Sequence, residues 1–157
     1  MLAAMRGRDA DGATAARAGP AELISTERVV RVAAFRAALR SFLRESERAA
    51  RRCGLTPQRY QLLLAIKGAP DGSERLNFTE LADRLQLSRN AVTELVQRAE
   101  QAGLVARAPS RDDQRVVFLE VTDNGARRLN AVLHELDANR TELAGAFEHL
   151  TATFRPG

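Results

Sequence analysis

The sequence contains a single cysteine, Cys53, and only two histidines, His134 and His149. One cysteine excludes an internal disulfide framework, and these three residues do not have the spacing of a metal site. No run of apolar residues approaches the roughly 20 that a helix needs to cross a bilayer. The opening residues also lack the apolar segment of a secretory signal. We therefore expect a cytoplasmic protein that holds no metal or cofactor and does not enter a membrane.

Motifs that carry catalysis are missing as well. The sequence shows no nucleophile paired with a base, no paired acid motif and no glycine-rich loop that could cradle a phosphate. Both histidines fall in a segment that we predict to be helical, where a surface or interface role is commoner than catalysis. The sequence therefore predicts that the protein is not an enzyme.

What the chain does have is length and positive charge. Its 157 residues are enough for one domain with a real core. It carries 24 basic and 20 acidic side chains, which gives a net charge of +4 and a pI near 10.4. Nearly all of the positive charge comes from arginine. This excess favours a polyanionic partner, and a homodimer would carry twice as much.

Residues 77–103 predict two short helices joined by a tight corner. Asn77 is expected to cap the first helix, with Glu80 closing a capping box, and Ser88 is expected to cap the second. Apolar residues recur at helical spacing in both segments and should be buried. They are Leu81, Ala82 and Leu85 in the first helix, and Val92, Leu95, Val96 and Ala99 in the second.

Polar side chains near the start of the second helix face away from its apolar stripe. They are Arg89, Asn90, Thr93 and Gln97. Such side chains donate and accept hydrogen bonds at base edges, and this layout is typical of a helix-turn-helix protein that reads the major groove. An ordinary helical hairpin with a solvated face remains the alternative at this point.

The residues after position 103 alternate as in a β-hairpin. The second strand, residues 115–121, places Arg115 on one face with three apolar residues. The loop before it carries Arg111 and also Asp113, which is close enough to Arg115 for the carboxylate to brace the guanidinium. A rigid arginine at a hairpin tip suits the narrow minor groove. Alternatively, the pair is a structural bridge that fixes the loop.

Long helical segments flank this region. Residues 21–52 predict one helix with an apolar seam, and five arginines at steps of four run beside that seam, with Glu45 and Glu47 near enough to compensate their charge. The seam residues are Val32, Phe35, Leu39, Phe42, Ser46, Ala49 and Cys53. The segment after residue 122 is one helix or two, broken near residues 137–141. We expect the flanking segments to meet across a dimer axis.

Between these parts, Thr56 followed by Pro57 predicts the start of another helix. That helix is expected to bury Tyr60, Leu63, Leu64 and Ile66. Leu76, just ahead of the next helix, predicts either a short strand or a hydrophobic staple.

Taken together, these features resemble the MarR family of winged-helix transcriptional regulators. The resemblance covers about residues 55–125 and rests on the run LADRLQLSRNAVTELVQRAEQAGLVAR, the DQR of the hairpin and the VTDNG at its end. It implies a mainly α fold with a small β-hairpin (α+β), in which residues 22–157 form a single domain after a disordered tail over residues 1–21. Residues 55–122 would be the winged helix-turn-helix part, and residues 22–53 and 123–157 the dimerisation helices.

The resemblance also implies a function. Family members usually act as homodimeric repressors that bind a palindromic operator in double-stranded DNA and release it when a small aromatic or anionic effector binds. The second helix of the helix-turn-helix would be the recognition helix, and its residues Arg89, Asn90, Thr93 and Gln97 would contact base edges. The β-hairpin would be the wing, which contacts DNA through Arg111, Asp113 and Arg115. Weaker candidates for phosphate contacts are Thr56, Gln58 and Arg84. Candidates for the effector site are Phe42, Tyr60 and Leu64. A protein-interaction module that does not read DNA sequence is the alternative.

The family also includes members that sense oxidation through a cysteine. Here Cys53 lies in the seam, where burial makes a thiol poorly reactive. Arg51 and Arg52 beside it could instead lower its pKa. We expect the buried, unreactive thiol.

Overall fold

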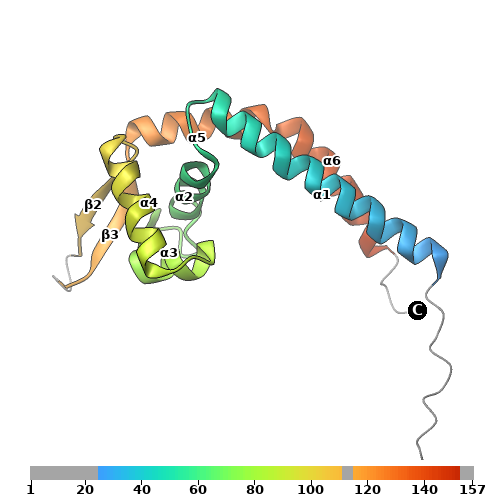
Figure 1. The fold of residues 1–157 in the computed structure, drawn as a ribbon, viewed down its shortest axis with the longest axis horizontal. Coiled ribbons are helices and arrows are strands. Elements are labelled where there is room, and N and C mark those ends of the chain that lie inside the picture. The colour runs from blue at the N-terminus through green and yellow to red at the C-terminus, as the bar shows by residue number, and fades with distance from the viewer. Residues whose placement is uncertain (1–24, 111–114, 153–157) are drawn as a thin grey trace, which may run out of the picture.

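The computed structural model describes residues 25–110 and 115–152 (Figure 1). The predicted tail over residues 1–21 and the wing residues Arg111 and Asp113 lie outside the described residues. Six helices are described: α1 (Thr26–Arg52), α2 (Pro57–Lys67), α3 (Phe78–Leu85), α4 (Arg89–Gln101), α5 (Asp123–Glu135) and α6 (Asp137–Thr151). Three strands are described: β1 (Arg75–Asn77), β2 (Val105–Pro109) and β3 (Val117–Val121). Within the described part of the chain, no helix has the length and apolarity to cross a membrane. The mainly α architecture with a small sheet confirms the predicted fold class.

The sheet is antiparallel, and β3 is its central strand. The order is β1-β3-β2, with Leu76 opposite Leu119 and Arg107 opposite Leu119 on the other side. The predicted hairpin is therefore present, and of the two alternatives for Leu76 the strand is correct. Leu76 on β1 and Leu119 on β3 are both buried, so β1 contributes to the hydrophobic core together with β3.

Side-chain caps fix the starts of the two helices of the helix-turn-helix, α3 and α4. The Asn77 side chain accepts hydrogen bonds from the amides of Thr79 (2.9 Å) and Glu80 (3.0 Å), while the Glu80 carboxylate accepts one from the Asn77 amide (2.8 Å). Ser88 caps α4 by accepting a hydrogen bond from the Ala91 amide at 3.2 Å. Both predicted caps are confirmed, because each depends only on residues within one turn.

The core lies between α2, α3, α4 and the sheet. Its largest fully buried side chains include Leu62, Leu63, Ile66, Leu81, Leu104, Leu119, Val92 and Val96. The prediction that Leu64 is buried is wrong, since it is 37% exposed. At about 100° per residue, Leu64 lies on the side of α2 opposite Leu62 and Ile66, which are the residues that face the core.

The helices α1 and α6 run side by side as a long arm that projects away from α2, α3 and α4 (Figure 1). The α1 seam is buried at Ser46 and Ala49, near the compact part, and only half-buried further out. On the arm, Val30 and Phe147 are 60% and 52% exposed, and α6 has no buried residue. A single chain therefore leaves apolar surface of the arm uncovered.

The last helical segment consists of two helices. They meet at Leu136, which is fully buried and ends α5 just before α6 begins. Arg140 donates hydrogen bonds to the Leu133 carbonyl (2.6 Å) and to Asp137 (2.8 Å) across this junction. The break thus lies at the edge of the predicted range, where the chain turns from the core onto the arm.

Candidate nucleic-acid interface

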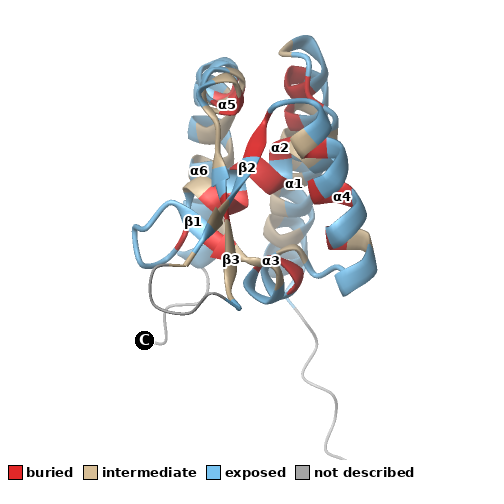
Figure 2. Cartoon of the chain, turned by 90° about the vertical axis from the view of Figure 1, so that its left-hand side faces the viewer, coloured by how far each residue is buried: buried red, intermediate tan, exposed pale blue. Residues whose placement is uncertain are grey.

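The helix α4 buries one side and exposes the other. Val92, Leu95, Val96 and Ala99 are buried against the body of the protein, as predicted. The predicted base-reading residues Arg89, Asn90, Thr93 and Gln97 are all exposed. Figure 2 shows the exposed edge of α4 on the outside of the molecule, with its buried residues turned inward. The helix can therefore enter a groove without disturbing the core.

Two of the exposed side chains of α4 have local partners. The Thr93 hydroxyl donates to the Arg89 carbonyl at 2.9 Å, which leaves its oxygen as an acceptor. Arg98, which the sequence analysis did not single out, lies 3.4 Å from the Glu94 carboxylate. Such an exposed pair is weak, so Arg98 can exchange Glu94 for a phosphate. Its helical spacing from Glu94 was visible in the sequence, but its position beside α2 was not.

The wing, formed by β2, β3 and the residues between them, carries Arg107 on β2 and Arg115 just ahead of β3. Arg115 is exposed, but it lies in the turn before β3 and not within the strand as predicted, because β3 begins only at Val117. It lines a hollow of about 390 Å³ together with Phe78 and Arg107. The Arg107 guanidinium is bound by Glu100, whose hydrogen bonds raise the pKa of Arg107. Arg75 lies over the Phe118 ring, 4.6 Å from its centroid. The predicted Asp113–Arg115 pair involves a residue outside the described part of the chain, so it stays a prediction.

Gln58 lies between the other two phosphate candidates: it shares one hollow with Thr56 and lines a larger cavity together with Arg84. Thr56 caps α2 by accepting a hydrogen bond from the Arg59 amide (3.2 Å), and Thr56 and Gln58 line a hollow of about 280 Å³ that also contains Arg98. They thus lie beside α4. Arg84 donates instead to the Gly68 carbonyl at 2.8 Å, which ties α3 to the end of α2.

The junction between the wing and α5 explains the VTDNG motif. The Thr122 hydroxyl donates to the Gly103 carbonyl (2.7 Å) and accepts from the Gly125 amide (3.1 Å). A Cβ on Gly125 would lie 2.3 Å from the Leu104 carbonyl oxygen, so only glycine fits. The motif fixes the end of the hairpin against the residues that follow α4.

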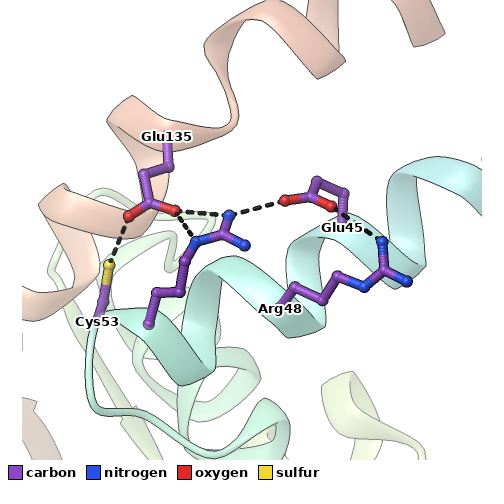
Figure 3. Close-up of polar contacts among 5 residues, drawn as sticks. Glu45, Arg48, Cys53 and Glu135 are labelled. Atoms are coloured by element: carbon purple, nitrogen blue, oxygen red, sulfur yellow. Dashed lines mark hydrogen bonds and ion pairs between the residues drawn. The ribbon is translucent and has the colours of Figure 1, made fainter.

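A charged cluster joins the end of α1 to the end of α5 (Figure 3). Arg52 contacts Glu45 at 2.7 Å and Glu135 at 2.8 Å, and Arg48 lies 3.5 Å from Glu45. These hydrogen bonds lower the pKa of Glu45 and raise that of Arg52. Glu45 thus pairs with two of the five arginines of the stripe, Arg48 and Arg52.

Cys53 is half-buried at the edge of this cluster. Burial, followed by the charge of Glu135 and a 3.5 Å contact to its carboxylate, raises the pKa of the Cys53 thiol, and Arg52 opposes this more weakly. The predicted burial of Cys53 is therefore only partly met, while the raised pKa is in the direction expected for a poorly reactive thiol, and its reactivity stays a prediction. Among the described residues, no group of histidine, cysteine and acidic side chains could hold a metal ion.

A cavity of about 410 Å³ lies between α1, α2 and the helix-turn-helix. Its lining includes Tyr60 and, from α4, Leu95. Ser46 also lines it, is only 4% exposed, and its hydroxyl has no hydrogen-bond partner among the described residues. Of the predicted effector residues, only Tyr60 lines this cavity. Phe42 lies one turn before Ser46 on the same face of α1, outside the cavity, and Leu64 faces outward.

These features define a winged helix: a capped helix-turn-helix followed by a β-hairpin, with a third strand before α3. Residues 54–116 match the model of the MarR family. The HTH-type transcriptional repressor MdtR of Bacillus subtilis (strain 168) is 36% identical over 80 residues, which are 51% of this chain and 49% of MdtR. The chain thus spans about half the length of this relative. The match to the MarR family thus covers the helix-turn-helix and β2, and it ends just before β3.

Solved structures share the fold over more of the chain. A mutant of the Escherichia coli MarR protein in complex with operator DNA aligns with a TM-score of 0.59 at 20% identity, covering 86% of this chain and 96% of that one. NadR in complex with 4-hydroxyphenylacetate aligns with a TM-score of 0.61 at 23% identity, covering 71% and 76%. Both matches establish a shared fold that extends into the flanking helices.

Proposed function

We propose that the protein is a transcriptional regulator that binds double-stranded DNA in a sequence-specific manner, without enzymatic activity. The observation that carries this is the exposed polar set on α4, backed by a fully buried stripe and flanked by an arginine-bearing wing. Such a helix can lie in a major groove while the wing reaches the adjacent minor groove. MdtR is named a repressor, and repression is the sign of regulation that we propose here. A protein with this partner would act in the cytoplasm.

The proposed active form is a homodimer on a palindromic operator. The arm formed by α1 and α6 leaves Val29, Val30 and Phe147 half-exposed, and a second arm would cover them. Two recognition helices related by a two-fold axis would read half-sites about one helical turn, roughly 10 bp, apart. We propose that the bases are contacted by Arg89, Asn90, Thr93 and Gln97. The minor groove is contacted by the wing residues Arg111, Asp113 and Arg115. Phosphates lie near Thr56 and Gln58, and Arg84 is the weakest candidate for such a contact.

The decisive experiment compares specific with random DNA. A palindrome selected from a randomised library by the full chain should bind at least about 10³-fold more tightly than random duplex at the same salt concentration. Equal binding to both, or binding to neither, would favour the alternative function, a winged-helix protein-interaction module.

We also propose that a small effector controls DNA binding from the cavity at Ser46. The unpaired, buried Ser46 hydroxyl offers a hydrogen bond that a ligand with a polar group can satisfy, and Tyr60 provides an aromatic wall. The cavity touches α4 through Leu95, so filling it can shift the recognition helix. The NadR structure contains 4-hydroxyphenylacetate, which makes aromatic acids the first ligands to test.

The test of the effector proposal is a thermal-shift screen of aromatic acids and phenols. A ligand of this cavity should raise the melting temperature and weaken operator binding, and Ser46→Val should abolish both effects. Stabilisation that persists in Ser46→Val would place the ligand elsewhere. A screen without any stabilising compound would argue against the proposal.

A further inference from the structure

A bidentate ion pair connects the recognition helix to the wing. Arg107 on β2 donates from Nε to one Glu100 carboxylate oxygen at 2.9 Å and from Nη2 to the other at 3.0 Å. Glu100 lies in the last turn of α4. This two-point geometry fixes direction as well as distance, which a single contact does not.

The same guanidinium reaches a third element. It lies over the ring of Phe78, 5.4 Å from the centroid, and Phe78 is the first residue of α3, directly after β1. The Arg107 side chain therefore contacts both α4 and α3, and Arg107 itself belongs to strand β2 of the sheet. The Arg107 side chain is 48% exposed, so its contribution to overall stability should be small. The role of Arg107 is therefore argued from the positions of its contacts and not from a contribution to stability.

We propose that Arg107 is a positioning residue for DNA reading: with Glu100 it holds the wing at a fixed angle to α4, and so increases sequence discrimination without contacting DNA. This inference rests on the proposed function. An arginine on a wing strand would ordinarily be assigned to a phosphate. Here the guanidinium edge formed by Nε and Nη2 is already occupied by Glu100, and moving it to DNA would leave that carboxylate unpaired near the phosphates.

The two roles predict opposite results for Glu100→Gln. If Arg107 only positions the wing, releasing it should loosen the wing and reduce discrimination. If Arg107 is a phosphate contact restrained by Glu100, releasing it should strengthen binding to every sequence. The ratio of operator to random-DNA affinity separates the two, because a change in net charge alone affects both affinities alike.

The experiment uses the full chain and measures operator and random-DNA affinity over a salt series. The variants are Arg107→Gln, Glu100→Gln, their combination, and the exchanged pair Glu100→Arg with Arg107→Glu. We expect each single change to lower the affinity ratio about three- to tenfold, and the combination to cost no more than one single change, as for residues that act as a unit. The exchanged pair should recover part of the ratio. The salt dependence should stay as in the wild type after Arg107→Gln.

Other outcomes would overturn the inference. An unchanged affinity ratio in both single variants would do so, as would a loss of about 0.9 in the slope of log affinity against log salt after Arg107→Gln, which marks a lost phosphate contact. Melting temperatures show whether a variant is folded, and Arg107→Lys, which cannot form the two-point contact, provides a second variant with full charge. A wild-type protein that does not discriminate at all would instead refute the proposed function.

Discussion

Arg52 Nη2 and Glu135 Oε2 lie 2.8 Å apart, although 83 positions separate the two residues in the sequence. The pair joins the last turn of α1 to the last turn of α5, where the arm meets the winged helix (Figure 3). The same Glu135 carboxylate lies beside Cys53, a contact that cannot be predicted from the sequence of either segment alone. The pKa of this thiol is therefore raised first by burial and then by a carboxylate from a distant part of the sequence.

The first prediction concerns that thiol. Because Glu135 raises the pKa of Cys53, Glu135→Gln should lower it and increase the thiolate fraction at any pH below the pKa. Alkylation by iodoacetamide at pH 7.5 should become about two- to fivefold faster, since the thiolate is the nucleophile. The pH dependence of the rate measures this directly. Glu47→Gln, which removes an equal charge paired with Arg51, is the control and should change little. Identical profiles for all three proteins would contradict the assignment.

The second prediction concerns the wing junction. Gly125→Ala should destabilise the fold by about 1–3 kcal/mol, because the added methyl group meets the Leu104 carbonyl and the Val121 side chain. Urea unfolding measures the loss. Gly145→Ala is the matched control: it is also helical, nothing lies within 4 Å of the added Cβ, and helix propensity favours alanine by up to about 1 kcal/mol. Equal effects at the two sites would mean that the junction is not tightly packed.

The third prediction concerns DNA contacts. Asn90→Ala and Arg115→Ala should each weaken operator binding by about 1–3 kcal/mol, the range for a good side-chain contact to a base. Titrations at matched salt measure this. Arg127→Ala removes the same charge as Arg115→Ala from an exposed site on α5 and should leave specific affinity nearly unchanged. A loss of the same size at Arg127 would show that net charge, and not the wing, is responsible.

The fourth prediction concerns the arm. Phe147 is half-exposed and packs against Phe35, with ring centroids 5.9 Å apart. Phe147→Glu should convert a dimer into a monomer at micromolar concentration, because a charge cannot be buried there without a partner. Sedimentation reports the mass, and Phe147→Leu should remain dimeric. A wild-type chain that is already monomeric would contradict the prediction and the proposed mode of operator binding.

The limits of sequence reasoning are visible at particular residues. The recognition-helix face was predicted in full, since its spacing alone separates buried Val92 and Val96 from exposed Asn90 and Gln97. Leu64 was misassigned, because its apolar character did not reveal which side of α2 would be covered. Of the residues that line the cavity around Ser46, only Tyr60 is predicted as an effector contact, since a serine in an apolar seam gives no sign of an unpaired hydroxyl. Nothing in the sequence distinguishes Arg107 from the other basic residues, because Glu100, which binds it, belongs to a different element.

The sequence by itself determined where α2, α3 and α4 begin and which face of α4 is buried. Capping by Thr56, Asn77 and Ser88, and the periodicity between the caps, depend on residues a turn or two apart, so neighbouring residues suffice to encode them. Only the tertiary structure decided that Glu135 would face Cys53, that β1 would complete the sheet and that Glu100 would hold Arg107. These pairings join segments whose approach depends on how the whole core packs, and no local pattern specifies that.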